Sequence, residues 1–374
     1  VLLSYRYRIE PNRAQATALS EMLGDFCQLY NAALEHRINA YKHGVSIKCN
    51  EQIVTLPEIR RDLPHQGRWS ATAQQQVLRK LDKAYKAFFG RVKRGATAGF
   101  PRFRARDRYH AADFRVGDGM TIRKSGKLGF VGIPGEIRVR WHRKLPSQPK
   151  SCILSRNAGK WYIIFHVEVA TVERASPESV GIDVGLSSFV ALSNGETVDR
   201  SNFTKRAERK LRRLQRALAR CKRGSNIRRK RKLAVATHQA YITSARRDFL
   251  HKQSRAIVNR FGRIAVEDLN IKGLARGMLA KSVHDASWGQ FVSLIRYKAE
   301  SAGCEFVEVD PRGTSQECPK CNAIAKKTLA ERTHRCSCGC VLDRDVAAAM
   351  VVHFRAFGFW PGAGLGLSTW PVAA

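Results

Sequence analysis

Residues 179–199 read SVGIDVGLSSFVALSNGETVD, and this stretch decides the fold of the carboxyl-terminal half. Its two apolar runs are typical of two strands with a tight connection, and the SNGE segment after them supplies turn residues. Asp183 ends the first run between Gly181 and Gly185, which allow close approach of other backbone. We therefore expect this strand to hold an acidic side chain beside a neighbouring element.

Two further acids follow at comparable points. Glu267 ends the apolar run of GRIAVEDLNI, a predicted buried strand, and Asp345 opens the helix predicted for DRDVAAAM, whose small residues let it lie close against a sheet. Asp268 and Asp343 are competing choices. Carboxylate oxygens suit Mg²⁺ or Mn²⁺, and two such ions activate water and stabilise the leaving oxygen in phosphodiester hydrolysis. The three separated acids predict a nuclease.

The segments around Glu267 indicate the type of sheet. SWGQFVSLIRYKAESAG (287–303) has the apolar spacing of an amphipathic helix, and CEFVEVDP (304–311) is a predicted strand. Because strand, helix and strand follow one another, a mixed α/β sheet is expected.

Five of the ten cysteines cluster between the second and third acids. CPKC (318–321) and CSCGC (336–340) are separated by fourteen residues, the pattern of two knuckles that meet at a tetrahedral zinc ion. Redox-active thiols would need a thioredoxin-like context, which is lacking. Four thiolates leave no position for water, so a structural zinc is expected. The favoured ligands are Cys318, Cys321, Cys336 and Cys338, with Cys340 as an alternative.

The charge of the chain points to a polyanion. Its 374 residues carry 67 Lys+Arg against 31 Asp+Glu, a formal net charge of +36. Such an excess favours nucleic acid, although a ribosomal-type or merely soluble basic protein shares it. Six Trp and 17 Phe are enough for the cores of two or more domains. Neither a membrane span nor a secretory signal is apparent, so we expect a protein of the reducing cytoplasm.

The first half of the chain changes pattern twice. A strand is predicted at 3–9, helices at about 12–41 and 71–91, and short alternating runs over 100–172 that are typical of an antiparallel sheet or barrel. The strand at 3–9 is expected to join that sheet, which makes the helices an insertion. Arg102 and Arg104 alternate with phenylalanines, as in surfaces that grip phosphates and stack bases.

A long basic helix is predicted from about residue 200 to 221. Leucines form one apolar stripe on this helix, cations occupy the rest of its surface, and Glu208 is the single acid in the run. We therefore favour a row of cations that binds nucleic-acid phosphates, here called the phosphate track, over an ordinary solvated face. The cations of the track that we select are Arg209, Arg212, Arg213, Arg216 and Arg220.

At these residues the chain resembles the TnpB family of transposon-encoded RNA-guided endonucleases, which is related to type V CRISPR effectors. The resemblance lies in GIDVGLSSFVAL, AVEDLNIKGL, TSQECPKC, CSCG and DRDVAAA in that order, with FPRFR and LDKAYKAFF upstream. It implies a RuvC-like nuclease domain of RNase H fold with an inserted zinc ribbon, and a β-barrel wedge domain with a helical recognition insertion. The implied ranges are 1–11 and 96–172 for the wedge, 12–95 for the insertion, 173–312 and 342–374 for the nuclease and 313–341 for the ribbon.

The resemblance assigns roles to single residues. The catalytic acids of the family fall on Asp183, Glu267 and Asp345, with two Mg²⁺ ions, and Asp343 becomes a structural acid. The chain departs from the family at two places. The family usually has Asn where this chain has Ala347, and it usually has two residues between the cysteines of the second pair, where this chain has only Ser337. Residues reading a short motif beside the target would lie in the insertion and barrel. Our choices for these are Gln75, Arg79 and Lys83.

The implied partners are a guide RNA from the transposon end and double-stranded target DNA, bound by one copy of the protein in a prokaryotic cytoplasm, at the nucleoid. Base pairing would carry most of the specificity, and a single nuclease site would cut both strands in turn. Two alternatives stay open. One is a DDE-like transposase or accessory transposition protein, and the other is a guided DNA-binding repressor with an inactive nuclease.

Overall fold

A computed structural model describes the chain except for residues 171–175, 202, 271–272, 274–279, 329–330 and 362–374. The chain divides into two compact units, Leu2–Val169 and Ala170–Ala374, the latter with Val1. Part of the predicted linker and the end of the predicted nuclease domain lie outside the described residues.

The first unit contains a nearly closed sheet. Its strand order is β4-β3-β2-β6-β7-β1-β5, and the edge strand β4 meets the residue before β5 through a bridge between Leu128 and Ile137. Two backbone hydrogen bonds of 2.9 and 2.8 Å form this bridge. The expected barrel is thus confirmed as a near-barrel, including the first strand, although β2 and β3 pair in parallel. The strands are β1 (Leu2–Glu10), β2 (Ala111–Val116), β3 (Gly119–Ile122), β4 (Leu128–Phe130), β5 (Arg138–Arg140), β6 (Ser151–Asn157) and β7 (Lys160–Glu168).

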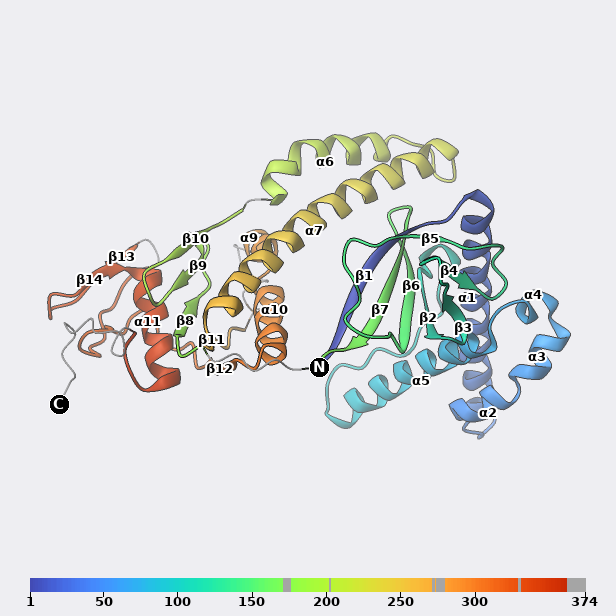
Figure 1. The fold of residues 1–374 in the computed structure, drawn as a ribbon, viewed down its shortest axis with the longest axis horizontal. Helices are drawn as coiled ribbons and strands as arrows, with labels where there is room; N and C mark the ends of the chain where they lie inside the picture. Colours follow the sequence, from blue (N-terminus) through green and yellow to red (C-terminus); the bar gives the residue numbers. More distant parts are fainter. Residues whose placement is uncertain (171–175, 202, 271–272, 274–279, 329–330, 362–374) are drawn as a thin grey trace. The chain divides into compact units, whose positions relative to one another are not determined.

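The helices of this unit share one core of buried residues with the sheet, and Figure 1 shows how α1 and α5 lie next to its strands. Asn12 and Gln15 form a capping box at the start of the first long helix, and Ser70 caps the second. The buried ring of Trp69 donates from Nε1 to Asp25 Oδ2 at 2.8 Å, which ties the connecting segment to the first helix. The helices are α1 (Arg13–Lys42), α2 (Cys49–Val54), α3 (Leu56–Asp62), α4 (Pro64–Gly67) and α5 (Ala71–Lys93), followed by a 3₁₀ turn at Arg106–Arg108.

The second unit contains the mixed sheet that the sequence predicts. The strand order is β10-β9-β8-β11-β12, in which β8, β11 and β12 run parallel and β9 and β10 are antiparallel. The strands are β8 (Ser179–Asp183), β9 (Ser188–Leu192), β10 (Thr197–Asp199), β11 (Arg263–Glu267) and β12 (Glu305–Val309).

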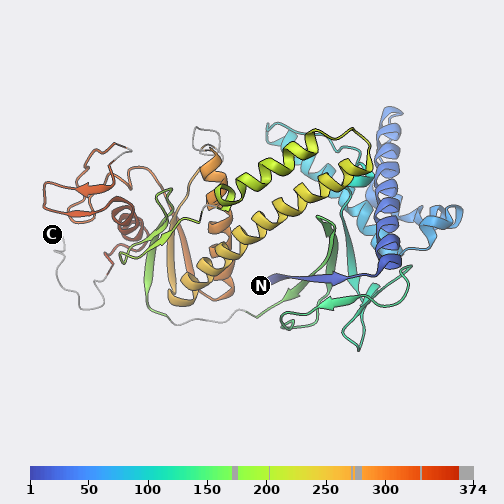
Figure 2. The ribbon, with the colours of Figure 1, turned by 90° about the horizontal axis from the view of Figure 1, so that it is seen from above.

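Helices cover both faces of this sheet. Apolar residues of α7 and α10, such as Leu250 and Phe291, pack in the cluster that contains Ile264, whereas Val352 of α11 packs on Ala265, whose side chain points to the opposite face. Both views show α6 and α7 side by side as a hairpin (Figures 1 and 2). The helices are α6 (Phe203–Ala219), α7 (Asn226–Arg260), α9 (Ala280–Ala286), α10 (Trp288–Ser301) and α11 (Arg344–Phe357).

A small hairpin precedes α11. β13 (Thr333–Arg335) pairs with β14 (Val341–Asp343), and the second cysteine-rich knuckle, residues 336–340, connects the two strands. Because β14 ends at Asp343, the hairpin leads directly into the helix that carries Asp345.

Candidate functional site

Asp183 and Glu267 end adjacent parallel strands. Asp183 is the last residue of β8 and Glu267 the last of β11, and the register pairs Ile182 with Val266 immediately before them. The carboxyl ends of parallel strands are a common place for functional side chains. Asp345 reaches the same place from the first turn of α11.

Two glycines allow α11 to approach β8. A Cβ at Gly181 would lie 2.6 Å from the backbone nitrogen of His353 and still closer to the carbonyl oxygen of Ala349. A Cβ at Gly185 would lie 3.1 Å from Asp345 Oδ2. Because neither glycine has a side chain, α11 can lie close to β8, and Asp345 comes near the other two acids. Ala347 is buried in α11.

The three carboxylates interact electrostatically. Burial and the negative charges of Glu267 and Asp345 raise the pKa of Asp183 well above its usual range, against an opposing effect of Arg344. Burial also raises the pKa of Glu267, partly offset by the hydroxyl of Thr314, which donates to Oε1 at 2.5 Å, and by the charge of Arg355. Carboxylate oxygens are the ligands that Mg²⁺ or Mn²⁺ prefers, and such an ion would offset the mutual repulsion of these acids.

The competing acids occupy different positions. Asp343 is the N-cap of α11, and its Oδ1 accepts from the backbone nitrogens of Asp345 (2.9 Å) and Val346 (3.1 Å). Asp268 is exposed. Asp343 therefore orients the helix, and the catalytic assignment of the other three stays a prediction. Sequence reasoning missed Thr314, because its contact with Glu267 spans 47 positions.

Replacing Asp183 by Asn is expected to stabilise the metal-free protein at neutral pH. A carboxyl whose pKa is raised by folding destabilises the fold when ionised, so stability is lost as the pH rises from the unfolded-state pKa through the folded-state pKa. Calorimetry in buffer free of Mg²⁺ and Mn²⁺, without chelator, should show Tm higher in D183N by roughly 2–4 °C at pH 7, with the gain gone near pH 4. An equal or lower Tm at pH 7 would contradict the electrostatic account.

The predicted zinc ligands lie together. The sulfurs of Cys318, Cys321, Cys336 and Cys338 are all within 4.8 Å of one another, with separations of 3.7 Å (Cys318 to Cys338) and 3.5 Å (Cys321 to Cys336). A tetrahedral ion with Zn–S bonds of about 2.3 Å needs sulfurs about 3.8 Å apart. The backbone N–H of Cys338 lowers the pKa of Cys336 to about 6, which favours the thiolate. The group thus fits a zinc ion.

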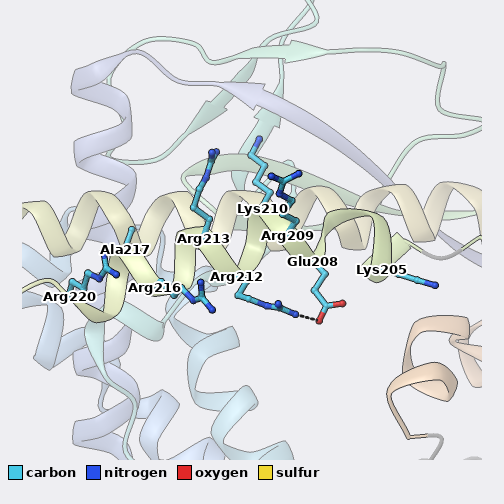
Figure 3. Close-up of a pocket in the computed structure, with 9 residues that line it drawn as sticks. All are labelled: Lys205, Glu208, Arg209, Lys210, Arg212, Arg213, Arg216, Ala217 and Arg220. Carbon is cyan, nitrogen blue, oxygen red and sulfur yellow. Dashed lines mark hydrogen bonds and ion pairs between the residues drawn. The ribbon is translucent and has the colours of Figure 1, made fainter.

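The chosen cations of the basic helix lie along α6, with Arg220 directly after its last residue. They line one hollow together with Lys205, Glu208, Lys210 and Ala217. Figure 3 shows Arg209, Lys210 and Arg213 pointing to one side of the helix, and Arg212, paired with Glu208 at 3.1 Å, to another. The guanidinium of Arg228 donates to the carbonyl oxygens of Leu218 and Cys221, so α7 caps the end of α6. The cations selected from the sequence that line the hollow are Arg209, Arg212, Arg213, Arg216 and Arg220.

The other predicted contacts lie in the first unit. Arg79 and Lys83 are exposed on α5, and Gln75 is half-buried there. Arg102 is exposed. The backbone of Arg104 exchanges hydrogen bonds of 2.8 and 2.9 Å with the side chain of Asn31, which fixes this segment against α1.

Family profiles match three parts of the chain. The matching profiles are described as "Helix-turn-helix domain" over residues 1–45, "Probable transposase" over 162–278 and "Cas12f1-like, TNB domain" over 288–352. A protein of Streptomyces pristinaespiralis named "Putative RNA-guided DNA endonuclease" is 33% identical over 356 residues, which cover 92% of this chain and 87% of that protein. The chain belongs to the TnpB family. A second relative is "Putative RNA-guided DNA endonuclease InsQ" of Escherichia coli (strain K12). It is 28% identical over an alignment that covers 90% of the TnpB chain and 87% of the relative.

The fold of this TnpB chain is also similar to a solved structure. The protein in "Cryo-EM structure of the Cas12f1-sgRNA-target DNA complex" aligns with a TM-score of 0.57 at 13% identity, over 91% of this chain and 83% of that chain. This likeness supports the multidomain α/β architecture. Among the described helices of the TnpB chain, none has the length and apolarity to cross a membrane.

Proposed function

We propose that this protein is a transposon-encoded, RNA-guided DNA endonuclease with one RuvC-like site. The observation that carries the proposal is that Asp183, Glu267 and Asp345 come together from two adjacent strands and a helix, where burial and the charges of the other two acids raise the pKa of Asp183. A mixed sheet in which an antiparallel hairpin extends three parallel strands, with helices on both faces, agrees with an RNase H fold. The relatives named as RNA-guided DNA endonucleases support the substrate class.

The three carboxylates would hold two Mg²⁺ ions, or Mn²⁺, which supply an activated water and stabilise the leaving oxygen of the phosphodiester. The remaining roles belong to the chain. Thr314 fixes Glu267 by its hydrogen bond, and Asp343 fixes the first turn of α11 by capping it. Arg344 Nε lies 3.6 Å from Asp345 Oδ1 and offsets part of the negative charge. These contacts would keep the carboxylates in place before substrate arrives.

We propose the roles of the other parts of the chain from its similarity to the TnpB family. The near-barrel and helices of the first unit would form the wedge domain (1–11 and 96–172) and recognition insertion (12–95), with Gln75, Arg79 and Lys83 reading the DNA motif beside the target. Residues 173–312 and 342–374 would be the nuclease domain and 313–341 the zinc ribbon, with zinc in a structural role. Arg102, Arg104 and the cations of α6 would contact phosphates. One copy would act on its RNA in the cytoplasm, at the nucleoid.

The test is the RNA that copurifies with the protein. We expect a defined transcript of the transposon end with a variable 3′ segment, and cleavage of plasmid DNA that matches this segment and carries the adjacent motif.

Replacing Arg209, Arg213 and Arg216 by Gln should weaken binding of that RNA by roughly tenfold to a hundredfold. The slope of log affinity against log salt concentration should fall by about 2, since fewer counterions are released.

A matched variant distinguishes the effect of the phosphate track on RNA binding from the effect of total charge. Lys42, Lys48 and Arg61 are exposed on other helices or their flanks, and their replacement by Gln removes the same charge. RNA binding near that of the wild type is expected in this variant. Equal losses in both variants would contradict the track, and strand-transfer products formed without RNA would instead indicate a DDE-like transposase.

A further inference from the structure

The ribbon contains a second group of potential metal ligands. The sulfurs of Cys318 and Cys340 and a ring nitrogen of His334 all lie within 4.8 Å of one another. All three residues are buried, whereas Cys321, Cys336 and Cys338 of the first group are exposed or half-buried. The two groups share only Cys318.

The histidine of this group has an unsatisfied nitrogen. His334 is fully buried on β13, and its Nδ1 contacts Nζ of Lys327. Its Nε2 is also buried and has no hydrogen-bond partner among the described residues. A buried polar atom without a partner costs about 1–3 kcal/mol, and such atoms usually have a ligand or water. Sequence reasoning did not select His334, because a single histidine between the two knuckles carries no spacing signal.

The third member is the fifth cysteine of the cluster. Gly339, with φ of 81°, separates Cys338 from Cys340, so the chain reverses between them and the two sulfurs fall into different groups. Cys340 is a reduced, buried thiol beside Cys318. It is therefore placed as a ligand of a different ion, and not as a substitute for Cys336 or Cys338.

We propose that the ribbon binds a second thiophilic metal ion through Cys318, His334 and Cys340, with the sulfur of Cys318 bridging the two ions. Thiolate and imidazole are the donors that zinc prefers, and a thiolate has enough lone pairs to bind two ions. A tetrathiolate zinc centre carries two negative charges. Adding one thiolate and one dication reduces this to one, so the second ion lowers the charge held in the interior. Three protein ligands leave the fourth position to water or a small anion.

The test uses the metal content of the purified protein, freed of nucleic acid and prepared without chelator. We expect about two zinc ions per chain in the wild type and about one in both Cys340→Ser and His334→Ala. Cys221→Ser removes a half-buried thiol at the end of α6 and is the matched control, with two ions expected. One ion per chain in the wild type would overturn the proposal, whether or not the variants retain it.

A spectroscopic measurement avoids dependence on variants that fold poorly. After exchange into ¹¹³Cd²⁺, the wild-type protein should give two resonances, one for four sulfur ligands and one shifted upfield by a nitrogen ligand. The second resonance should be absent in C340S. A single resonance in the wild type would again overturn the proposal. Neither result depends on nuclease activity, so the second ion and the proposed function are tested separately.

Discussion

Asp183→Ala should reduce cleavage of target DNA by about a thousandfold or more, while RNA binding stays within about twofold of the wild type. Asp183 lies between the other two acids in the electrostatic network, so its loss removes a shared ligand of both proposed ions. Binding of RNA depends on the basic surfaces, which this change leaves intact. The measurement is single-turnover cleavage with saturating protein and RNA complex at several Mg²⁺ concentrations.

A neighbouring acid supplies the control. Asp268 follows Glu267 directly but is exposed, so Asp268→Ala removes an equal charge at the end of the same strand. Cleavage by D268A should stay near the wild-type rate. Wild-type cleavage by D183A would refute the catalytic assignment, and equal losses in D183A and D268A would mean that charge near β11, and not coordination, governs the rate.

The second large effect is expected from a single methyl group at Gly181. The added Cβ would meet the backbone of Ala349 and His353, which cannot move without shifting α11 along the sheet. We expect Gly181→Ala to destabilise the second unit by about 3 kcal/mol or more. Cleavage should fall as well, because the same shift separates Asp345 from Asp183. Denaturant unfolding followed through the second unit measures the first effect.

Gly90 provides the comparison for this variant. It lies within α5, and a Cβ there would meet nothing within 4 Å. Gly90→Ala should be neutral or stabilising by about 0.5–1 kcal/mol, since alanine loses less entropy in a helix. Unchanged stability in G181A would show that α11 does not pack on β8 as described.

Sequence patterns predicted the parts of the fold that depend on local periodicity. The apolar runs before Asp183 and Glu267 gave the strands, and the small residues after Asp345 gave the helix that packs on them. The cysteine spacing predicted the sulfur cluster. The near-barrel followed from alternating short runs.

Contacts between distant positions were not predictable in this way. Thr314 and His334 are a single hydroxyl and a single imidazole in the sequence, and only folding brings them to Glu267 and to the sulfurs. The helices of the first unit are predicted as an insertion, and no local pattern indicates that Trp69 would share a core with the sheet. The parallel pairing of β2 and β3 likewise has no local signal, because residue alternation is the same in both pairings.

The junction at Asp343 has a consequence for how activity depends on metal supply. This residue ends the ribbon hairpin, pairs with Thr333 across it, and holds the first turn of the helix that carries Asp345. If the ribbon holds zinc and Asp345 is catalytic, as proposed, a ribbon that folds without the ion would misplace Asp345, which lies seven positions beyond Cys338. Such a nuclease would depend on two metal pools, a slowly exchanging one filled during synthesis and a rapidly exchanging one filled at the time of cutting. Protein made in zinc-poor cells would then stay inactive however much magnesium is added later.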